Sequence, residues 1–159
     1  MPVSCIFALN NRPSSNLSCL GFGSIEAYSG RDLGRDNPRA VALEGIGPIP
    51  PGRYYIIDRE TGGRLGWARD LWAEYANGND HSQWFSLWNP STGDITIVNG
   101  VKRGNFRIHP SGISGLSKGC ITIVNKADFI KLREFIRSGP PSIPIPGARQ
   151  KAYGIVEVR

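Results

Sequence analysis

The sequence predicts a mainly β domain that carries one clear helix. Its 159 residues include 20 glycines and 12 prolines, which favour turns between short segments over long helices. Several short runs alternate apolar and polar residues with period two, as strands with one buried face do. Only one stretch repeats its apolar residues at convincing helical spacing. The length fits a single domain, residues 1–159, that can bury a core.

The strands predicted in the first third of the chain are short. They cover Cys5–Leu9, Leu20–Gly23, Ile25–Tyr28 and Tyr54–Ile57. Residues 10–18 and 29–38 are rich in turn-forming residues and are interpreted as loops. Gly47–Gly52 holds three prolines and two glycines. We expect this segment to be a rigid turn that feeds the next strand, with no chemical group of its own.

The middle of the chain predicts a short helix and a hairpin. The helix would cover Asp70–Gly78, with an aspartate to cap it and Asn-Gly to end it. The hairpin would pair Trp84–Trp88 with Ile95–Val98 across a turn at residues 89–93. The three aromatic side chains of its first strand are expected mainly in the core, with a share lining a cleft that packs on sugar or peptide.

The one clear helix follows Val124. Asn125 is a good N-cap, and Asp128 suits the positive end of the helix dipole. Apolar residues recur at helical spacing at Phe129, Leu132 and Ile136. Gly139 and the two prolines after it end the helix. The apolar run Tyr153–Val158 predicts a last strand in the centre of the sheet.

Two reactive side chains stand on either side of a glycine-rich loop. His109 closes the alternating run Phe106–His109, and Cys120 opens the run Cys120–Val124. The loop between them contains three glycines and can fold back sharply, because glycine adopts positive φ at little cost. A strand–loop–strand arrangement would therefore bring His109 beside Cys120.

A histidine beside a cysteine can serve as the general base of a thiol nucleophile, because the imidazole can take the thiol proton to form an ion pair. Lys118 would add positive potential that favours the thiolate. The backbone N–H groups of Gly119 and Cys120 would face a developing oxyanion. Pro110 fixes the chain after His109, so that a nearby carbonyl can hold the ring in one tautomer. The alternative is that Cys120 is a small buried hydrophobe and His109 an ordinary polar residue at a strand end.

This stretch resembles the catalytic domain of the YkuD-type L,D-transpeptidases. That family carries a histidine, a gap, and Ser/Thr-His-Gly-Cys followed by an apolar residue. The matching residues here are His109, Ser117, Gly119, Cys120 and Ile121. Lys118 stands in place of the second histidine, Thr122 in place of an arginine or asparagine, and the gap is shorter. These departures concern the oxyanion hole and the substrate clamp rather than the nucleophile and its base.

A closer resemblance is to a divergent branch, the type VI secretion L,D-transpeptidase effectors. These carry Gly-Pro-Ile-Pro-x-Gly-x-Tyr, then Arg-x-His-Pro, a Gly/Ser loop, and Ser-x-Gly-Cys-Ile-Thr. The corresponding segments here are Gly47–Tyr54, Arg107–Pro110 and Ser117–Thr122, in the same order. The short gap between histidine and cysteine is typical of this branch.

The resemblance implies a compact β-sandwich or barrel-like domain of the L,D-transpeptidase type, with its main helix after the cysteine. It implies that Cys120 attacks the carbonyl at the L-centre of the diamino acid in a peptidoglycan stem peptide and expels the terminal D-alanine. Water would then complete an L,D-carboxypeptidase reaction, and an amine would complete transpeptidation or D-amino-acid exchange. His109 would act as base and then acid, Ser117 would shape the loop, and Lys118 and Arg107 would meet substrate carboxylates. No cofactor is implied.

The effector resemblance also implies a route and a partner. Such a protein leaves its producer through the type VI secretion apparatus, acts in the periplasm of target bacteria, and is matched by an immunity protein that plugs its cleft. The N-terminal residues lack a basic region followed by a long apolar one, so we expect synthesis in the cytoplasm without a signal peptide. No apolar run is long enough to span a membrane.

Charge and cysteine content restrict the partners. The formal net charge of +6 suits a polyanion, but the basic residues are scattered and no nucleic-acid motif is present, so no nucleic-acid partner is predicted. Three cysteines without Cys-x-x-Cys spacing, with two histidines, predict no structural zinc site. Cys5 and Cys19 are expected to be buried free thiols, and a bridge between them is the less favoured alternative.

The sequence also fits other functions. A sortase also places its histidine before its cysteine but usually needs a longer gap and a downstream arginine, whereas papain-like wall hydrolases place the cysteine first. His81 lies in a polar segment and is a rival base without a motif around it. A non-catalytic basic β module that binds wall polymer would keep Cys120 buried and unreactive.

Overall fold

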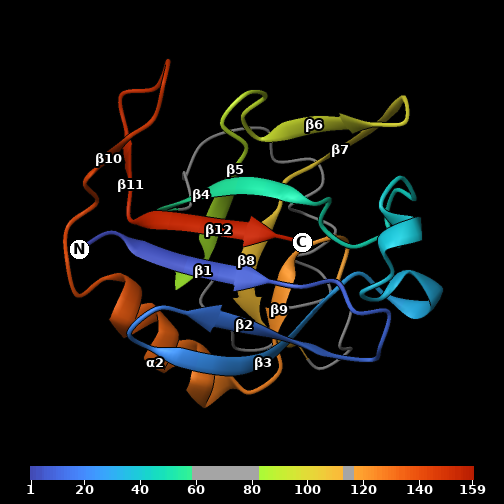
Figure 1. Cartoon of the computed structure of the whole chain (residues 1–159), viewed down its shortest axis with the longest axis horizontal. Coiled ribbons are helices and arrows are strands. Elements are labelled where there is room, and N and C mark those ends of the chain that lie inside the picture. Colours follow the sequence, from blue (N-terminus) through green and yellow to red (C-terminus); the bar gives the residue numbers. More distant parts are fainter. Residues whose placement is uncertain (59–82, 113–116) are drawn as a thin grey trace.

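The computed structural model describes residues 1–58, 83–112 and 117–159. Within them, eight strands close into a barrel in the order β1-β12-β4-β5-β8-β9-β3-β2 (Figure 1). This confirms the predicted mainly β, barrel-like fold. The barrel strands are β1 (Val3–Phe7), β2 (Ser15–Cys19), β3 (Gly23–Ser29), β4 (Gly52–Asp58), β5 (Phe85–Trp88), β8 (Arg107–Pro110), β9 (Ile121–Ile123) and β12 (Gly154–Val158).

Smaller elements project from the barrel or lie in its loops. Figure 1 shows two hairpins above the barrel, β6–β7 towards the right and β10–β11 at the left. Their strands are β6 (Ile95–Val98), β7 (Val101–Gly104), β10 (Ile143–Pro144) and β11 (Lys151–Ala152). Two short 3-10 helices follow β3, namely η1 (Asp32–Gly34) and η2 (Pro38–Ala40).

Helix α2 (Lys126–Ile136) is the one α-helix in the described part of the chain, and it begins where the sequence predicts. The side chain of Asn125 caps it by accepting a hydrogen bond from the backbone N–H of Ala127 at 2.8 Å. Figure 1 shows α2 along the lower edge of the barrel, beneath β2 and β3. Its apolar face is buried in the barrel core through Phe129, Leu132 and Ile136.

The last strand is central, as predicted. β12 pairs in parallel with β1 and antiparallel with β4. Of the described residues, none belongs to a helix long and apolar enough to cross a membrane. The helix predicted over Asp70–Gly78, and His81, lie outside the described residues.

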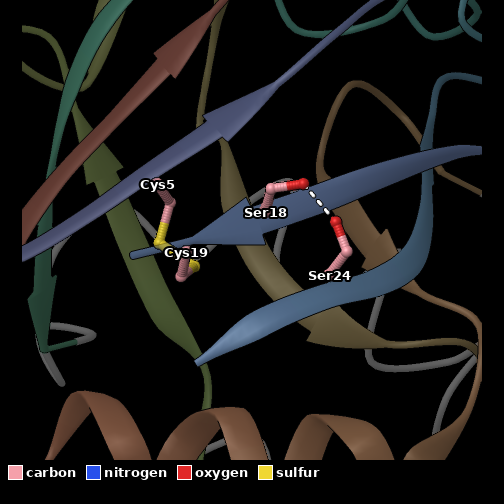
Figure 2. Close-up of a disulfide and its surroundings, with 4 residues drawn as sticks. All are labelled: Cys5, Ser18, Cys19 and Ser24. Carbon is pink, nitrogen blue, oxygen red and sulfur yellow. Dashed lines mark hydrogen bonds between the residues drawn. A yellow bond between two sulfur atoms is a disulfide. The ribbon is translucent and has the colours of Figure 1, made fainter. Parts of the chain in front are cut away.

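The two N-terminal cysteines form a disulfide, so the prediction of two free thiols is wrong. Cys5 on β1 and Cys19 on β2 are direct partners in the antiparallel register, with Cα atoms 4.0 Å apart. Figure 2 shows the bridge between these strands and, beside it, the hydrogen-bonded hydroxyls of Ser18 and Ser24. The bridge was missed because β2 lies largely in a segment interpreted as turn-rich. Only Leu17 and Cys19 mark its buried face as apolar.

The hairpin predicted between β5 and β6 does not form. β5 pairs with β4 and β8 inside the barrel, and a tight turn joins the backbones of Asn89 and Gly93. β6 instead pairs with β7 across Asn99 and Gly100, which have φ of 49° and 78°. Asn-Gly with positive φ at both positions is the favoured chemistry of a two-residue hairpin turn, and it determined the pairing.

Candidate active site

The two reactive residues lie on or next to β8 and β9, which are parallel neighbours in the barrel. Their register pairs His109 with Thr122 and Ile108 with Ile121. The isoleucines belong to the core, so the alternation of the strands turns His109 and Thr122 to the opposite, outer face. Both side chains are nonetheless fully buried, so other parts of the chain cover this face.

Cys120 immediately precedes β9. Alternation back from Thr122 places Cys120 on the same outer face as His109, one diagonal step away across the two strands. With strands about 4.8 Å apart and a rise of about 3.3 Å per residue, that step is about 8 Å between Cα atoms. The two strands therefore run parallel, whereas a sharp fold-back was expected, and their register still places the two positions near each other.

His109 is held in one orientation and one tautomer. Its Nδ1 lies 2.8 Å from the carbonyl oxygen of Pro110. Because a carbonyl only accepts hydrogen bonds, Nδ1 carries the proton and the lone pair is on Nε2. The ring of Trp84 stacks on the imidazole with centroids 4.5 Å apart and an interplanar angle of 24°. The carbonyl that sequence analysis expected near His109 is thus the one of Pro110 itself.

The thiol of Cys120 is buried, with the residue only 2% exposed. Its Sγ lies 3.8 Å from the carbonyl oxygen of Asn105. Burial raises the pKa of Cys120 to about 11, against the opposing influence of the charge and backbone N–H of Arg107 and the charge of Arg103, while Asp94 raises it further. Burial therefore favours the neutral thiol, and a nucleophilic attack would need a base to take its proton.

Ser117 and Gly119 fix the turn that precedes Cys120. The Ser117 hydroxyl donates to the carbonyl oxygen of Cys120 at 2.9 Å and accepts from the backbone N–H of Gly30 at 3.2 Å. Gly119 has φ of +107°, and a Cβ built there would lie 2.6 Å from Nη2 of Arg103. Both the backbone conformation and the space therefore require glycine.

The family model described as the Tlde1 domain matches residues 23–146, which is more than half of the chain and includes all of these site residues. The chain belongs to the Tlde1 domain family. This is a family of type VI secretion L,D-transpeptidase effectors. No curated protein and no solved structure matches the chain. The wider likeness to YkuD-type enzymes stays a prediction.

Arg107 of this Tlde1 domain is engaged inside the protein. Its Nη1 lies 2.9 Å from Oδ1 of Asp94 and donates to the carbonyl oxygen of Phe106 at 2.8 Å. The side chain is 10% exposed. Lys118, the other residue expected to meet substrate carboxylates, is half-buried and stands two positions before Cys120 in the sequence. Arg107 and Arg103 supply positive charge near Cys120. The positive potential expected from Lys118 stays a prediction.

The sequence did not predict a role for Arg103, which lies on β7 and is 3% exposed. Its Nη1 donates to the carbonyl oxygen of Val41, and its Nη2 donates to that of Gly47 at 3.0 Å. Gly47 opens the proline-rich turn that was expected to be architectural only. No local signal marks Arg103, because its partner Gly47 lies 56 positions away in the sequence.

The site of this Tlde1 domain contains a buried thiol, an imidazole with a defined basic nitrogen, and two arginines. Within residues 1–58, 83–112 and 117–159, no group of three His, Cys, Asp or Glu side chains could hold a metal ion. The groups present are those that acyl transfer through a thioester uses.

Proposed function

We propose that this Tlde1 domain is a peptidoglycan acyl-transfer enzyme in which Cys120 is the nucleophile and His109 the general base. The proposal rests on the placement of His109 on β8 and of Cys120 directly before the parallel neighbour β9, with Nε2 of His109 as the basic nitrogen. Membership of the effector family supports the substrate class, a stem tetrapeptide of peptidoglycan.

In the first step, Sγ of Cys120 forms a bond to the carbonyl carbon at the L-centre of the diamino acid. The thiol proton passes to Nε2 of His109 as this bond forms, because burial keeps the thiol neutral until then. The carbonyl oxygen becomes an oxyanion and accepts hydrogen bonds from the backbone N–H groups of Gly119 and Cys120. Ser117 holds the turn that presents these donors.

In the second step, the C–N bond to D-alanine breaks, and the imidazolium of His109 gives its proton to the leaving amine. This leaves a thioester on Cys120 and a neutral imidazole. Water or an amine then attacks the thioester, loses a proton to His109, and displaces the sulfur, which takes that proton back. Water yields the tripeptide, and an amine yields a cross-link or an exchanged D-amino acid.

The decisive test is mass spectrometry of muropeptides after incubation with the protein. The wild type is expected to convert tetrapeptide to tripeptide, or to exchange D-alanine for an added D-amino acid. Cys120→Ala and His109→Ala should abolish both reactions, whereas His81→Ala, which removes the other histidine, should retain them. Release of D-alanine by Cys120→Ala would refute the assigned nucleophile.

The effector role has its own test. Made in the cytoplasm and delivered by the type VI apparatus, the protein would act in the periplasm of target bacteria, where a cognate immunity protein would cover the site. Expression with a periplasmic signal should be toxic, and expression without one should not. Cys120→Ala directed to the periplasm is the matched control. Equal toxicity from the cytoplasm would contradict a cell-wall target.

A second candidate, a non-catalytic module that binds wall polymer, is favoured by one observation, the burial of Cys120 and the raised pKa of its thiol. The Cys5–Cys19 bridge leaves Cys120 as the one free cysteine, so labelling reports on it alone. Unreactive Cys120 together with unchanged muropeptides would support the binding module.

A further inference from the structure

We propose that Arg103 is a positioning residue for Cys120. From the β6–β7 hairpin, it packs against the turn that carries Cys120 and holds a permanent positive charge near the sulfur. Asp94 supplies the opposing negative charge. This inference rests on the proposed function for its chemical role, but its geometry is independent of any substrate.

The guanidinium of Arg103 is immobilised. Nη1 donates to the carbonyl oxygen of Val41 and Nη2 to that of Gly47, and the residue is almost completely buried. These two carbonyls belong to the segment between η2 and β4, so Arg103 ties the hairpin to that segment. An arginine stays protonated even when burial lowers its pKa, so the charge is permanent.

Arg103 also forms one wall of the nucleophile turn. A Cβ at Gly119 would lie 2.6 Å from Nη2 of Arg103 and 3.0 Å from Cε1 of Phe106. The guanidinium carbon lies 5.6 Å from the centre of the Phe106 ring. The residue directly before Cys120 is therefore packed against a charged group and an aromatic ring, which together define its position.

The charges around Cys120 form a small cluster. Arg107 and Arg103 are positive, and Asp94 is negative and pairs with Arg107 at 2.9 Å. A thiolate in a buried site needs compensating positive charge, and the cluster supplies a net charge of about +1. Arg103 also interacts electrostatically with Tyr54, whose pKa is raised by burial so that it stays neutral, and with Glu44 in the segment between η2 and β4.

The test measures the rate at which iodoacetamide alkylates Cys120 while the Cys5–Cys19 disulfide is intact, at several values of pH below the thiol pKa. In this pH range the alkylation rate is proportional to the thiolate fraction, so a shift of one unit in the thiol pKa changes the rate about tenfold. Arg103→Met is expected to slow alkylation roughly tenfold, and Arg103→Lys to restore most of the rate. Asp94→Asn is expected to speed it several-fold, because it removes the opposing charge.

A purely structural role of Arg103 predicts a different result. Loosening the turn would open the site and speed alkylation, so a rate for Arg103→Met equal to or above that of the wild type overturns the proposal. If Arg103→Met does not fold, judged by cooperative urea unfolding, Asp94→Asn decides alone, and an unchanged or slower rate refutes the charge cluster.

Alkylation needs no peptidoglycan, so it separates this inference from the proposed function. If the wild type does not act on muropeptides but the alkylation rates are as predicted, the proposed enzymatic function is refuted and the role of Arg103 towards the thiol stands. If the wild type is active and Arg103→Met equals it in both D-alanine release and alkylation, only the role of Arg103 is refuted.

Discussion

Replacing Gly119 with alanine tests how tightly the turn before Cys120 is packed. The new Cβ would lie 2.6 Å from Nη2 of Arg103 and 3.0 Å from Cε1 of Phe106, and the backbone has φ of +107°. The backbone strain costs about 1–3 kcal/mol, and overpacking a buried site costs about 1–3 kcal/mol more. Gly119→Ala is therefore expected to lower the free energy of unfolding by about 2–6 kcal/mol.

Gly23 provides a matched control. It has nearly the same φ, +113°, but no atom lies within 4 Å of a Cβ built there. Gly23→Ala therefore introduces the backbone strain of a positive φ but no close contact of the new Cβ. Gly139→Ala, with open space and no positive φ, introduces neither the strain nor a contact. Urea unfolding of the three variants separates the cost of the contacts with Arg103 and Phe106 from the cost of the backbone strain. If Gly119→Ala loses no more stability than Gly23→Ala, the packing argument is refuted.

Three further predictions concern stability. Cys5→Ser with Cys19→Ser is expected to lower the free energy of unfolding by about 3 kcal/mol in urea, because the bridge closes a loop of about 15 residues. Burial raises the pKa of Asp36 to about 6, so the native state holds a proton that the unfolded chain releases near pH 4. Stability should fall as pH rises from about 4 to 6, and Asp36→Asn should flatten this slope. Asn125→Ala should cost about 1 kcal/mol by uncapping α2.

Each of these three predictions would be contradicted by a specific result. Addition of a reductant should destabilise the wild type and leave the Cys5→Ser, Cys19→Ser double variant unchanged; an effect on both would point to something other than the bridge. Equal slopes between pH 4 and 6 for wild type and Asp36→Asn would remove Asp36 as the group responsible. Asn125→Asp, which keeps a side-chain acceptor, should unfold like the wild type, and a loss equal to that of Asn125→Ala would refute the capping argument.

Local chemistry made several features predictable from the sequence. The helix α2 could be placed because its cap, its apolar spacing and its glycine-proline end all lie within a few residues of one another. The strand that carries His109 and the strand that follows Cys120 could be placed because their alternation is local. The carbonyl that orients His109 belongs to the adjacent Pro110 and was anticipated for the same reason.

The tertiary structure decided what depends on partners distant in the chain. Strand pairing made β9 a parallel neighbour of β8, joined Cys5 to Cys19, and separated β5 from β6. Folding also brought Arg103 from a hairpin to the turn before Cys120, and burial raised the pKa of Cys120. Hydrogen-bond partners, burial and the charges around a group are properties of the assembled barrel, so no run of neighbouring residues encodes them.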